Sequence, residues 1–322
     1  MSIPLYILKR ILQAIPLLLI VSVISFFIIR LSPVDPLAEI KLNPSISPQT
    51  LQAEKERLGL DQPLHIQYLK WLKNFAQGNL GVSSSGELVA NRLMERIPNT
   101  ILLTVSTILM TWLVGIPLGI YSALNWKKPA DRILTILSSI GMAIPSFFFA
   151  LLLLIMAVKT GWFPVGGLTS PVFNNFSPAH KVVDILHHLF LPVLVLFTIS
   201  LSGLQRQMRG NLLDVLESDY IKLARAKGLP ENKVIYKHAV RNAINPMVTL
   251  IGFEFASLLS GAALTEYVFQ YPGLGRLVLE AVMKSDINLV MASLMIGAIM
   301  LVIGNLIADI LLKLVDPRIT IE

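Results

Sequence analysis

The feature that most constrains this chain is a series of apolar runs, each long enough to cross a lipid bilayer as a helix. The runs occupy residues 11–29, 97–126, 133–158, 185–205, 246–264 and 287–308, and only Glu254 places a charge inside one of them. A helix needs about 20 apolar residues to cross the hydrocarbon layer. Backbone polar groups cannot stay unpaired there, and barrel strands would show alternating polarity. The sequence therefore predicts an all-α membrane protein with six transmembrane helices.

The overall composition supports a lipid environment. Hydrophobic residues make up 54% of the chain and charged residues only 15%, whereas soluble domains carry about 25% charged residues. The net charge of +7 raises the question of nucleic acid, but the basic residues lie between apolar runs and form no tail or stripe. We therefore expect a lipid bilayer and no nucleic acid as a partner. The absence of cysteine excludes disulfides, thiolate metal sites and a cysteine nucleophile.

The distribution of Lys and Arg predicts that both termini are cytoplasmic. Six crossings leave both ends on one side, where Lys9 and Arg10 would share the cytoplasm with the basic loop at residues 206–245. A cleaved signal peptide also begins with basic residues before an apolar run. This run is long enough to span a bilayer and no small-residue cleavage site follows it, so we expect it to be retained as the first helix.

Three parts follow from this division. Residues 1–30 form the N-terminal start and first transmembrane helix, residues 31–96 an extracytoplasmic segment, and residues 97–322 a core with five transmembrane helices. The middle segment opens with a proline-rich stretch at residues 32–36. It is too short to bury much core alone, so we expect it to pack on the membrane helices.

Local signals predict three helices in that segment. One covers residues 47–58 and ends before Gly59, a second covers residues 63–75, and a third covers residues 86–97. A turn is expected at residues 78–81, where two glycines lie close together.

The cytoplasmic loop at residues 206–245 is polar but patterned. Asp219 is expected to cap a helix over residues 220–227, and Gly228 to end it in the left-handed conformation. Pro230 then opens a helix over residues 230–244, which leads into the fifth run at Pro246. Membrane orientation alone explains the basic charge. The helix–glycine–helix pattern also predicts a rigid projection that another protein can grip.

The sequence of this loop resembles a known motif. Residues 220–229, Tyr-Ile-Lys-Leu-Ala-Arg-Ala-Lys-Gly-Leu, together with His238-Ala239, Asn242-Ala243 and Pro246, are similar to the "EAA" coupling loop of ABC-importer membrane subunits. The form is that of the oligopeptide/dipeptide/nickel permease family. Only Ala224 and Gly228 keep the general motif, because Lys222 and Leu223 stand at its Glu and first Ala positions. These departures are typical of the peptide-type family. Further segments resemble the family in order along the chain, at residues 8–16, 31–36, 58–64, 78–83, 96–100, 266–276 and 316–318.

The resemblance implies a type I ABC importer permease fold in the bacterial inner membrane. Such a subunit works with a second homologous permease subunit, two cytoplasmic ATPase subunits and an extracytoplasmic solute-binding protein. It is not an enzyme and holds no cofactor, since ATP and Mg are bound by the ATPases. In agreement, this chain has no Gly-x4-Gly-Lys-Ser/Thr phosphate loop.

The cargo implied by the resemblance is di- or oligopeptide, and nickel, glutathione or another small solute are alternatives within the same class. A self-contained secondary transporter is an alternative of another class. It would need paired broken helices and an internal repeat, and the sequence shows neither. An intramembrane serine hydrolase lacks a base at a helical offset from its serines.

The expected functional residues fall into three groups. The ATPase-coupling residues implied by the resemblance are Tyr220, Ala224, Arg225, Ala226, Lys227, Gly228, Leu229 and Pro246. The re-entrant extracytoplasmic segment before the sixth run contains Glu266, Pro272, Gly273 and Gly275. Glu254 and Ser257 are candidates for the substrate pathway.

Individual side chains in these groups carry more specific expectations. Ala224 is expected to be small because helix and ATPase groove approach closely, and Arg225 and Lys227 to pair with acidic residues of the ATPase. A mid-span acid such as Glu254 is costly in lipid and marks a functional site by default, although a structural partner in the other subunit is the alternative. No metal site is expected, because His187 and His188 are adjacent on a helix and point in different directions.

Overall fold

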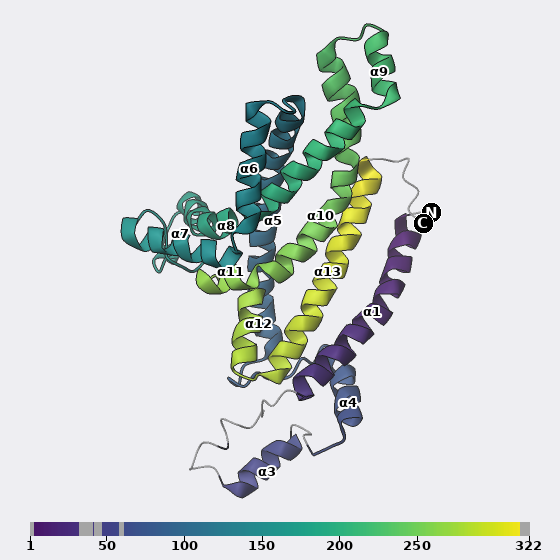
Figure 1. The fold of residues 1–322 in the computed structure, drawn as a ribbon. Helices are drawn as coiled ribbons and strands as arrows, with labels where there is room; N and C mark the ends of the chain where they lie inside the picture. The colour runs from purple at the N-terminus through teal and green to yellow at the C-terminus, as the bar shows by residue number, and fades with distance from the viewer. Residues whose placement is uncertain (1–2, 32–40, 42–46, 58–60, 316–322) are drawn as a thin grey trace.

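In a computed structural model the chain is described for residues 3–31, 41, 47–57 and 61–315 (Figure 1). The described residues form helices joined by short connections, and their only β pairing is an isolated bridge between Val82 and Leu88. The prediction of an all-helical chain is confirmed for this part. The proline-rich stretch at residues 32–36, Gly59 and the motif at residues 316–318 lie outside the described residues.

Four of the described helices are long and apolar enough to cross a membrane. They are α1 (Ile3–Leu31), α5 (Val89–Leu124), α8 (Pro178–Leu216) and α13 (Ile287–Val315). A bent pair of shorter helices, α6 (Pro129–Ala143) and α7 (Ser146–Thr160), provides a fifth if the pair is counted as one span. The count in the described residues is therefore four or five, against the six predicted.

The third predicted span, residues 133–158, is a bent pair of helices and not one continuous helix. Its halves α6 and α7 meet at an angle of 95°. The break falls at Pro145, which has no N–H to donate and which forces the preceding residue out of the helical region. Ile144 accordingly has an extended ψ of 121° and Pro145 a ψ of 136°. Hydropathy does not register a missing backbone donor, so the break is indicated by the proline and not by the apolar run.

Two other predicted boundaries also differ. The helix predicted at residues 86–97 and the second run are one helix, α5, because buried Val89 and Leu93 pack against α12 (Leu274–Met283) and α13 and so extend the apolar stripe. The fifth run begins inside a longer helix, α10 (Arg241–Gly261), and is followed directly by α11 (Ala263–Val268). In the described chain, α10 is not among the helices that qualify as spans by length and hydropathy.

Small residues allow α8 to be the central helix of the bundle. A Cβ placed on Gly119 of α5 would lie 2.6 Å from the Cβ of Met208 and 2.9 Å from the carbonyl of Gln205, both on α8. A Cβ on Gly141 of α6 would lie 2.6 Å from the hydroxyl of Ser202. Such close backbone approach is how membrane helices associate without a hydrophobic driving force.

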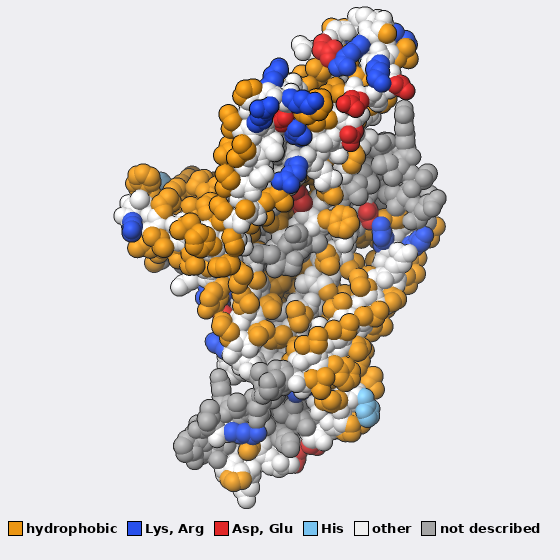
Figure 2. Space-filling view, viewed as in Figure 1, with side chains coloured by type: hydrophobic (Ala, Val, Ile, Leu, Met, Phe, Trp, Pro, Cys, Tyr) orange, Lys and Arg blue, Asp and Glu red, His pale blue; other side chains and the backbone are white. Residues whose placement is uncertain are grey.

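The two ends of the bundle differ in polarity. The first residues of α1 and the last residues of α13 lie toward the end that carries α9 (Asp219–Ala226), and α12 lies at the opposite end (Figure 1). On α1, Arg10 forms an ion pair of 2.7 Å with Asp309 of α13, and the Tyr6 hydroxyl donates to the same carboxylate at 2.7 Å. Charged side chains gather around α9 and the start of α6, whereas the flanks along α7 and α1 are mainly hydrophobic (Figure 2).

The predicted helices of the middle segment are present. They are α3 (Pro48–Arg57), whose Thr50 N–H donates to the Ser47 hydroxyl at 3.1 Å, and α4 (Leu64–Ala76). The turn expected at residues 78–81 is confirmed, since Gly78 and Gly81 have φ of 77° and 80°. α4 packs on α1 through Tyr68, which shares a 2.9 Å hydrogen bond with Ser22 and contacts the Phe26 ring edge-on.

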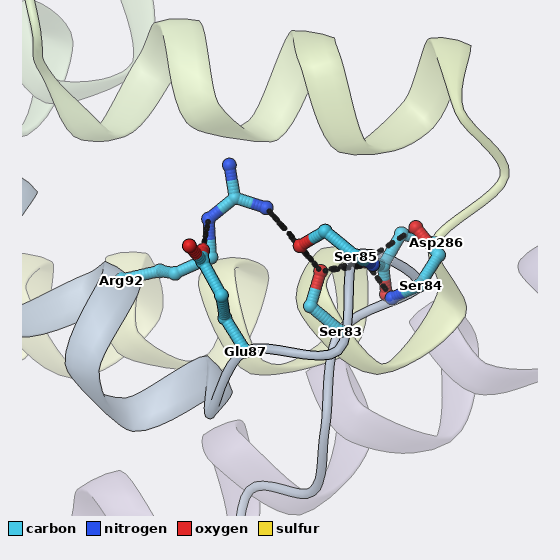
Figure 3. A network of polar contacts seen from close by, with 6 residues as sticks. All are labelled: Ser83, Ser84, Ser85, Glu87, Arg92 and Asp286. Atoms are coloured by element: carbon cyan, nitrogen blue, oxygen red, sulfur yellow. Dashed lines mark hydrogen bonds and ion pairs between the residues drawn. The ribbon is translucent and has the colours of Figure 1, made fainter.

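A buried carboxylate attaches the end of this segment to the corner between α12 and α13 (Figure 3). Asp286 Oδ2 accepts hydrogen bonds from the Ser83 hydroxyl at 2.5 Å and from the Ser84 N–H at 2.8 Å. Its Oδ1 accepts from the N–H of Leu289 at 3.0 Å, which caps the start of α13. The segment therefore packs on the membrane helices, as its small size predicted.

Candidate functional site

The loop between α8 and α10 projects from the bundle as a compact elbow, which we define as residues 217–240 (Figure 1). Its first helix is α9, and its second is a π-helix, η2 (Lys233–Val240). The predicted cap is displaced by one residue: Ser218 is the N-cap, and its carbonyl accepts from the N–H groups of Ile221 and Lys222, each at 3.2 Å. Asp219 instead lies in the first turn, where its charge favours the helix dipole.

Gly228 ends α9 as predicted. Its φ is 74°, in the left-handed region where a Cβ is disfavoured. The Gly228 N–H donates to the Arg225 carbonyl at 2.9 Å, and the Leu229 N–H donates to the Ala224 carbonyl at 3.4 Å. This pair of bonds is the Schellman arrangement, which satisfies the last carbonyls of a helix and reverses the chain.

An apolar cluster holds the elbow against the bundle. The side chains of Ile221 on α9 and of Val234 and Ala239 on η2 are fully buried against α8 and α10, and Ala224 and Leu229 pack at the edge of the cluster. A fully buried Ile or Val side chain contributes about 1.5–3 kcal/mol. Ala224 thus faces its own chain, which gives its small size an intrachain reason; the predicted contact with an ATPase groove stays a prediction.

The second helix of the elbow, η2, continues without a break into α10. Lys233 N–H donates to the Pro230 carbonyl at 2.8 Å, which starts the helix as predicted, and η2 then runs into Arg241. Pro246 lies inside α10 rather than at its start. Since proline cannot donate to the carbonyl four residues earlier, it loosens the helix near the point where the elbow joins the bundle.

An ion pair joins α9 to the residues just before η2. Arg225 Nη2 lies 2.7 Å from Glu231 Oε1, and Arg225 Nε lies 3.2 Å from both carboxylate oxygens. The Arg225 guanidinium lowers the pKa of the Glu231 carboxyl. Arg225 therefore has an intrachain partner, whereas Lys227 is exposed and forms no ion pair with the described residues. The pair is solvent-exposed, so it contributes at most about 1 kcal/mol.

One face of α9 is exposed and partly apolar. We define it as the outer face, consisting of Tyr220, Leu223, Ala226 and Lys227, which follow each other at helical spacing. Tyr220 is 46% exposed and Leu223 is 56% exposed. The Tyr220 hydroxyl accepts from Asn242 at 3.2 Å, which fixes the ring. In the sequence Leu223 marks only a departure from the motif, and the tertiary structure adds that its side chain is exposed.

Glu254 has a partner inside its own chain. Its Oε2 accepts a 2.7 Å hydrogen bond from the indole N–H of Trp112, which joins α10 to α5. Trp112 therefore gives Glu254 a structural partner within its own chain, while a partner in another subunit and a role in the substrate pathway both stay predictions. Ser257 lies in α10, and its side chain is outside the described residues.

The predicted re-entrant segment is built around a buried acid. Glu266 of α11 accepts from the Thr100 hydroxyl at 2.9 Å and from the Arg276 N–H at 2.9 Å, and Thr100 accepts from the Leu274 N–H at 2.7 Å. A Cβ on Gly273 would collide with the Glu266 carboxylate, so only glycine fits there. Glu266 therefore completes the N-terminus of α12 and attaches it to α5.

Two further members of the same segment have packing roles. A Cβ on Gly275 would lie 2.6 Å from the Cα of Ala263, so α11 and α12 touch backbone to backbone. The Pro272 carbonyl accepts from Asn99 at 2.8 Å. Asn99 and Thr100 were noted only as part of a motif, and no sequence signal indicated that they bind this turn.

A second buried acid lies where α5 turns into α6, and sequence reasoning missed it. Asp131 accepts from Arg209 Nε at 2.6 Å and Nη2 at 2.9 Å, from the Ser122 hydroxyl at 2.5 Å and from the Lys127 N–H at 3.1 Å. Arg209 belongs to the loop whose basic charge membrane orientation alone explains, so its charge gives no indication of this partner. The fork-to-fork geometry fixes the α5–α6 corner to α8 just before the elbow.

No group of three or more metal-binding side chains occurs in the part of the chain that the structure describes. His187 and His188 each contact a backbone carbonyl, that of Trp162 at 2.9 Å and that of Asp184 at 2.8 Å. These contacts give both histidines a structural setting.

Comparison with known families assigns the chain. Residues 115–321 match the family described as "Binding-protein-dependent transport system inner membrane component", and residues 4–104 match the N-terminal region of such membrane components. The chain belongs to this family. It is thus an inner membrane transport component, which agrees with the apolar helices described above.

Relatives of this binding-protein-dependent family align over nearly the whole chain. The oligopeptide transport system permease protein AppB of Bacillus subtilis is 41% identical over 320 residues, with 98% of each chain covered. The dipeptide transport system permease protein DppB of Alkalihalophilus pseudofirmus is 34% identical, and the glutathione transport system permease protein GsiC of Salmonella paratyphi A is 35% identical, again with 98% of each chain covered. The elbow and the Glu266 segment both lie within the matched residues 115–321.

Proposed function

We propose that this chain forms half of the translocation pathway of an ATP-driven importer and that a cytoplasmic ATPase subunit holds its elbow. The observation that carries the proposal is the outer face of α9, where Leu223 is 56% exposed on a helix whose other side packs on the bundle through the buried Ile221 and the partly buried Ala224. An exposed apolar anchor beside a lysine, on a rigid projection, is suited to a groove on a partner.

The elbow is built to transmit motion. Its apolar cluster joins α9 and η2 to α8 and reaches Ala123 on α5, and η2 continues directly into α10. When the ATPases close on ATP, displacement of the elbow moves α6, α8 and α10 as packed bodies. Alternating access then arises from rigid-body rocking of these helices.

The proposal includes the division of labour expected from the sequence. The chain itself binds no ATP, and the partners are a second homologous permease subunit, two ATPase subunits that bind ATP and Mg, and a solute-binding protein outside the membrane. The proposed arrangement is a type I fold with six crossings, cytoplasmic termini and an extracytoplasmic insertion at residues 31–96. In this arrangement α10 is the fifth crossing, and the bent pair α6–α7 is the third.

Di- and oligopeptides are the proposed cargo. The support comes from relatives named as oligopeptide and dipeptide permeases at 41% and 34% identity over the full chain. A relative named as a glutathione permease, at 35% identity, supports glutathione as a second candidate. Glutathione is itself a small peptide, so both cargoes present amide groups and terminal charges to the pathway.

Replacing Leu223 with aspartate tests the docking surface. Leu223 makes no contribution to the buried cluster, so the free energy of unfolding should change by no more than about 0.5 kcal/mol. Loss of an apolar anchor should weaken ATPase binding by about 2 kcal/mol or more, roughly thirtyfold. The measurement is co-purification of the ATPase subunits with the tagged chain, together with ATP-driven uptake in proteoliposomes.

The matched control is Lys222→Asp on the same helix. Lys222 is exposed, its one ion pair within the described chain is with Asp219, and it points away from the outer face. This control introduces the same side chain with a larger change of charge and should retain most ATPase binding. Equal loss in both variants, or full binding by Leu223→Asp, would contradict docking through the outer face.

Glu254→Gln tests the proposed pathway role. Glutamine keeps an oxygen that can accept from Trp112, so the join between α5 and α10 should persist while the charge is lost. We expect uptake of peptides with a free amino terminus to fall more than uptake of N-acetylated peptides. Trp112→Phe is the control, because it removes the partner but keeps the acid; the same selectivity change in Trp112→Phe, or none in Glu254→Gln, would refute the role.

A further inference from the structure

A polar cavity is lined by the last turn of α1, by α4 and by the start of α13. These three segments lie at the end of the bundle opposite the elbow (Figure 1). Its volume is about 180 Å³. Since roughly 10–15 Å³ admits one water, the cavity can take a polar group of several heavy atoms. Its polar lining consists of Arg30, Gln67, Lys70, Asn74, Asn79 and Asn288.

Among the described residues, the lining carries two cations and no acid. Arg30 lies over the Phe26 ring at 5.6 Å, but its Nε is buried and has no hydrogen-bond partner among the described residues. Lys70 forms no ion pair within the same part of the chain. A buried charged donor without a partner costs free energy, so an anionic acceptor in the cavity would stabilise the site.

The lining also contains an acceptor that lacks a partner. Gln67 donates through Nε2 to the Gln62 carbonyl at 2.7 Å, which leaves its Oε1 buried and without a partner in the described structure. Because the amide N–H is already committed, this oxygen requires a donor from the ligand. A ligand that carries both an anionic group and a hydroxyl donor would provide a partner for Arg30 and for Gln67.

The remaining polar groups hold the walls in place. Asn288 donates to the Val82 carbonyl at 3.0 Å, and Asn79 Oδ1 accepts from the Gly81 N–H at 3.1 Å. The adjacent network around Asp286 attaches the same turn to α13 (Figure 3). The cavity is therefore a preformed feature of three packed elements.

The surroundings of the cavity identify the source of the anion. On α1, Ile28 is 65% exposed and Leu31 is 74% exposed on either side of Arg30, and hydrophobic side chains line the flank of this helix (Figure 2). Leu69 of α4 is also exposed, and Trp71 lines the cavity. Apolar residues interleaved with Arg and Trp mark the depth at which lipid headgroups lie.

We propose that this cavity binds the headgroup of an anionic phospholipid. Arg30 and Lys70 contact the phosphate by charge-assisted hydrogen bonds, and Gln67 Oε1 accepts from a headgroup hydroxyl. The acyl chains lie along the exposed apolar flank of α1. The lipid thereby joins α1 to α4 and α13.

The test uses the full chain, purified in a non-ionic detergent, and follows its thermal unfolding as ligand is added. The probes are short-chain phosphatidylglycerol, short-chain phosphatidylcholine and inorganic phosphate. Phosphatidylglycerol should raise the unfolding temperature most, because only it combines net negative charge, hydroxyl groups and acyl chains. Removal of each cation should weaken its apparent affinity about tenfold.

The test variant is Arg30→Gln/Lys70→Gln, and the matched control is Lys73→Gln, an exposed lysine of α4 that does not line the cavity. Lys70→Gln alone serves if the double variant does not fold, since Lys70 is exposed. An equal lipid shift in wild type and test variant overturns the proposal. So does an equal shift by inorganic phosphate, which indicates a free-anion site. Weakened binding of the solute-binding protein with an unchanged lipid shift also overturns it, and indicates a protein interface.

Discussion

Replacing Gly228 with proline is expected to abolish ATP-driven uptake while the chain still inserts into the membrane. Gly228 has a φ of 74°, which proline cannot adopt, and its N–H bonds the Arg225 carbonyl at 2.9 Å. A misplaced proline costs about 3 kcal/mol, which lowers the population of the native elbow more than a hundredfold. The outer face of α9 then points away from its proposed partner, and the ATPase stroke no longer reaches α10.

Gly228→Asn is the matched control, because asparagine tolerates the left-handed conformation and keeps the N–H. It should retain most uptake, and nothing lies within 4 Å of the Cβ it would add. The measurements are uptake into proteoliposomes and the amount of chain in purified membranes. Normal uptake by Gly228→Pro would refute a rigid elbow as the coupling element, and equal loss in both variants would show that side-chain bulk, not backbone conformation, matters.

Replacing Arg209 with alanine is expected to destabilise the bundle more than any surface substitution in the elbow. Asp131 is buried, and the guanidinium supplies two of its four hydrogen bonds. Removal of one partner from a buried pair leaves an uncompensated charge and costs about 3–5 kcal/mol. The expected result is a lower unfolding temperature in detergent and detachment of the α5–α6 corner from α8.

A double-mutant cycle separates this effect from a general loss of packing. Asp131→Asn keeps a side chain that can bond the Ser122 hydroxyl and the Lys127 N–H, and in the double variant no buried charge remains. Asp131→Asn/Arg209→Ala should therefore be more stable than Arg209→Ala alone. If the two substitutions simply add, the pair does not act as a unit and the corner is held by apolar contacts instead.

Local signals in the elbow predicted its form well. The conformation at Gly228 depends on neighbours within a few residues, so a glycine after a helical pattern was sufficient to locate it. The cap was misplaced by one residue because Ser218 and Asp219 are both good caps and only the backbone geometry distinguishes them. Leu223 could not be identified as exposed, because the buried side of α9 is defined by contacts with α8 and η2.

The partners of the buried acids could not be predicted from local sequence signals. Asp131 and Arg209 are 78 residues apart, and Thr100 and Glu266 are 166 residues apart. Nothing in the chain near any of them indicates its partner. Their roles follow only from the packing of α6 against α8 and of α5 against α11.

The sequence alone determined that this chain is helical and resides in a membrane, because uncharged runs of about 20 residues have one stable solvent and one way to satisfy their backbone. Tertiary structure decided which polar groups meet, as at Asp131, Glu266 and the Arg30 cavity. The physical reason is the distance along the chain over which each effect acts. Hydropathy and capping act over a few residues, whereas the pairing of buried charges depends on which helices lie side by side.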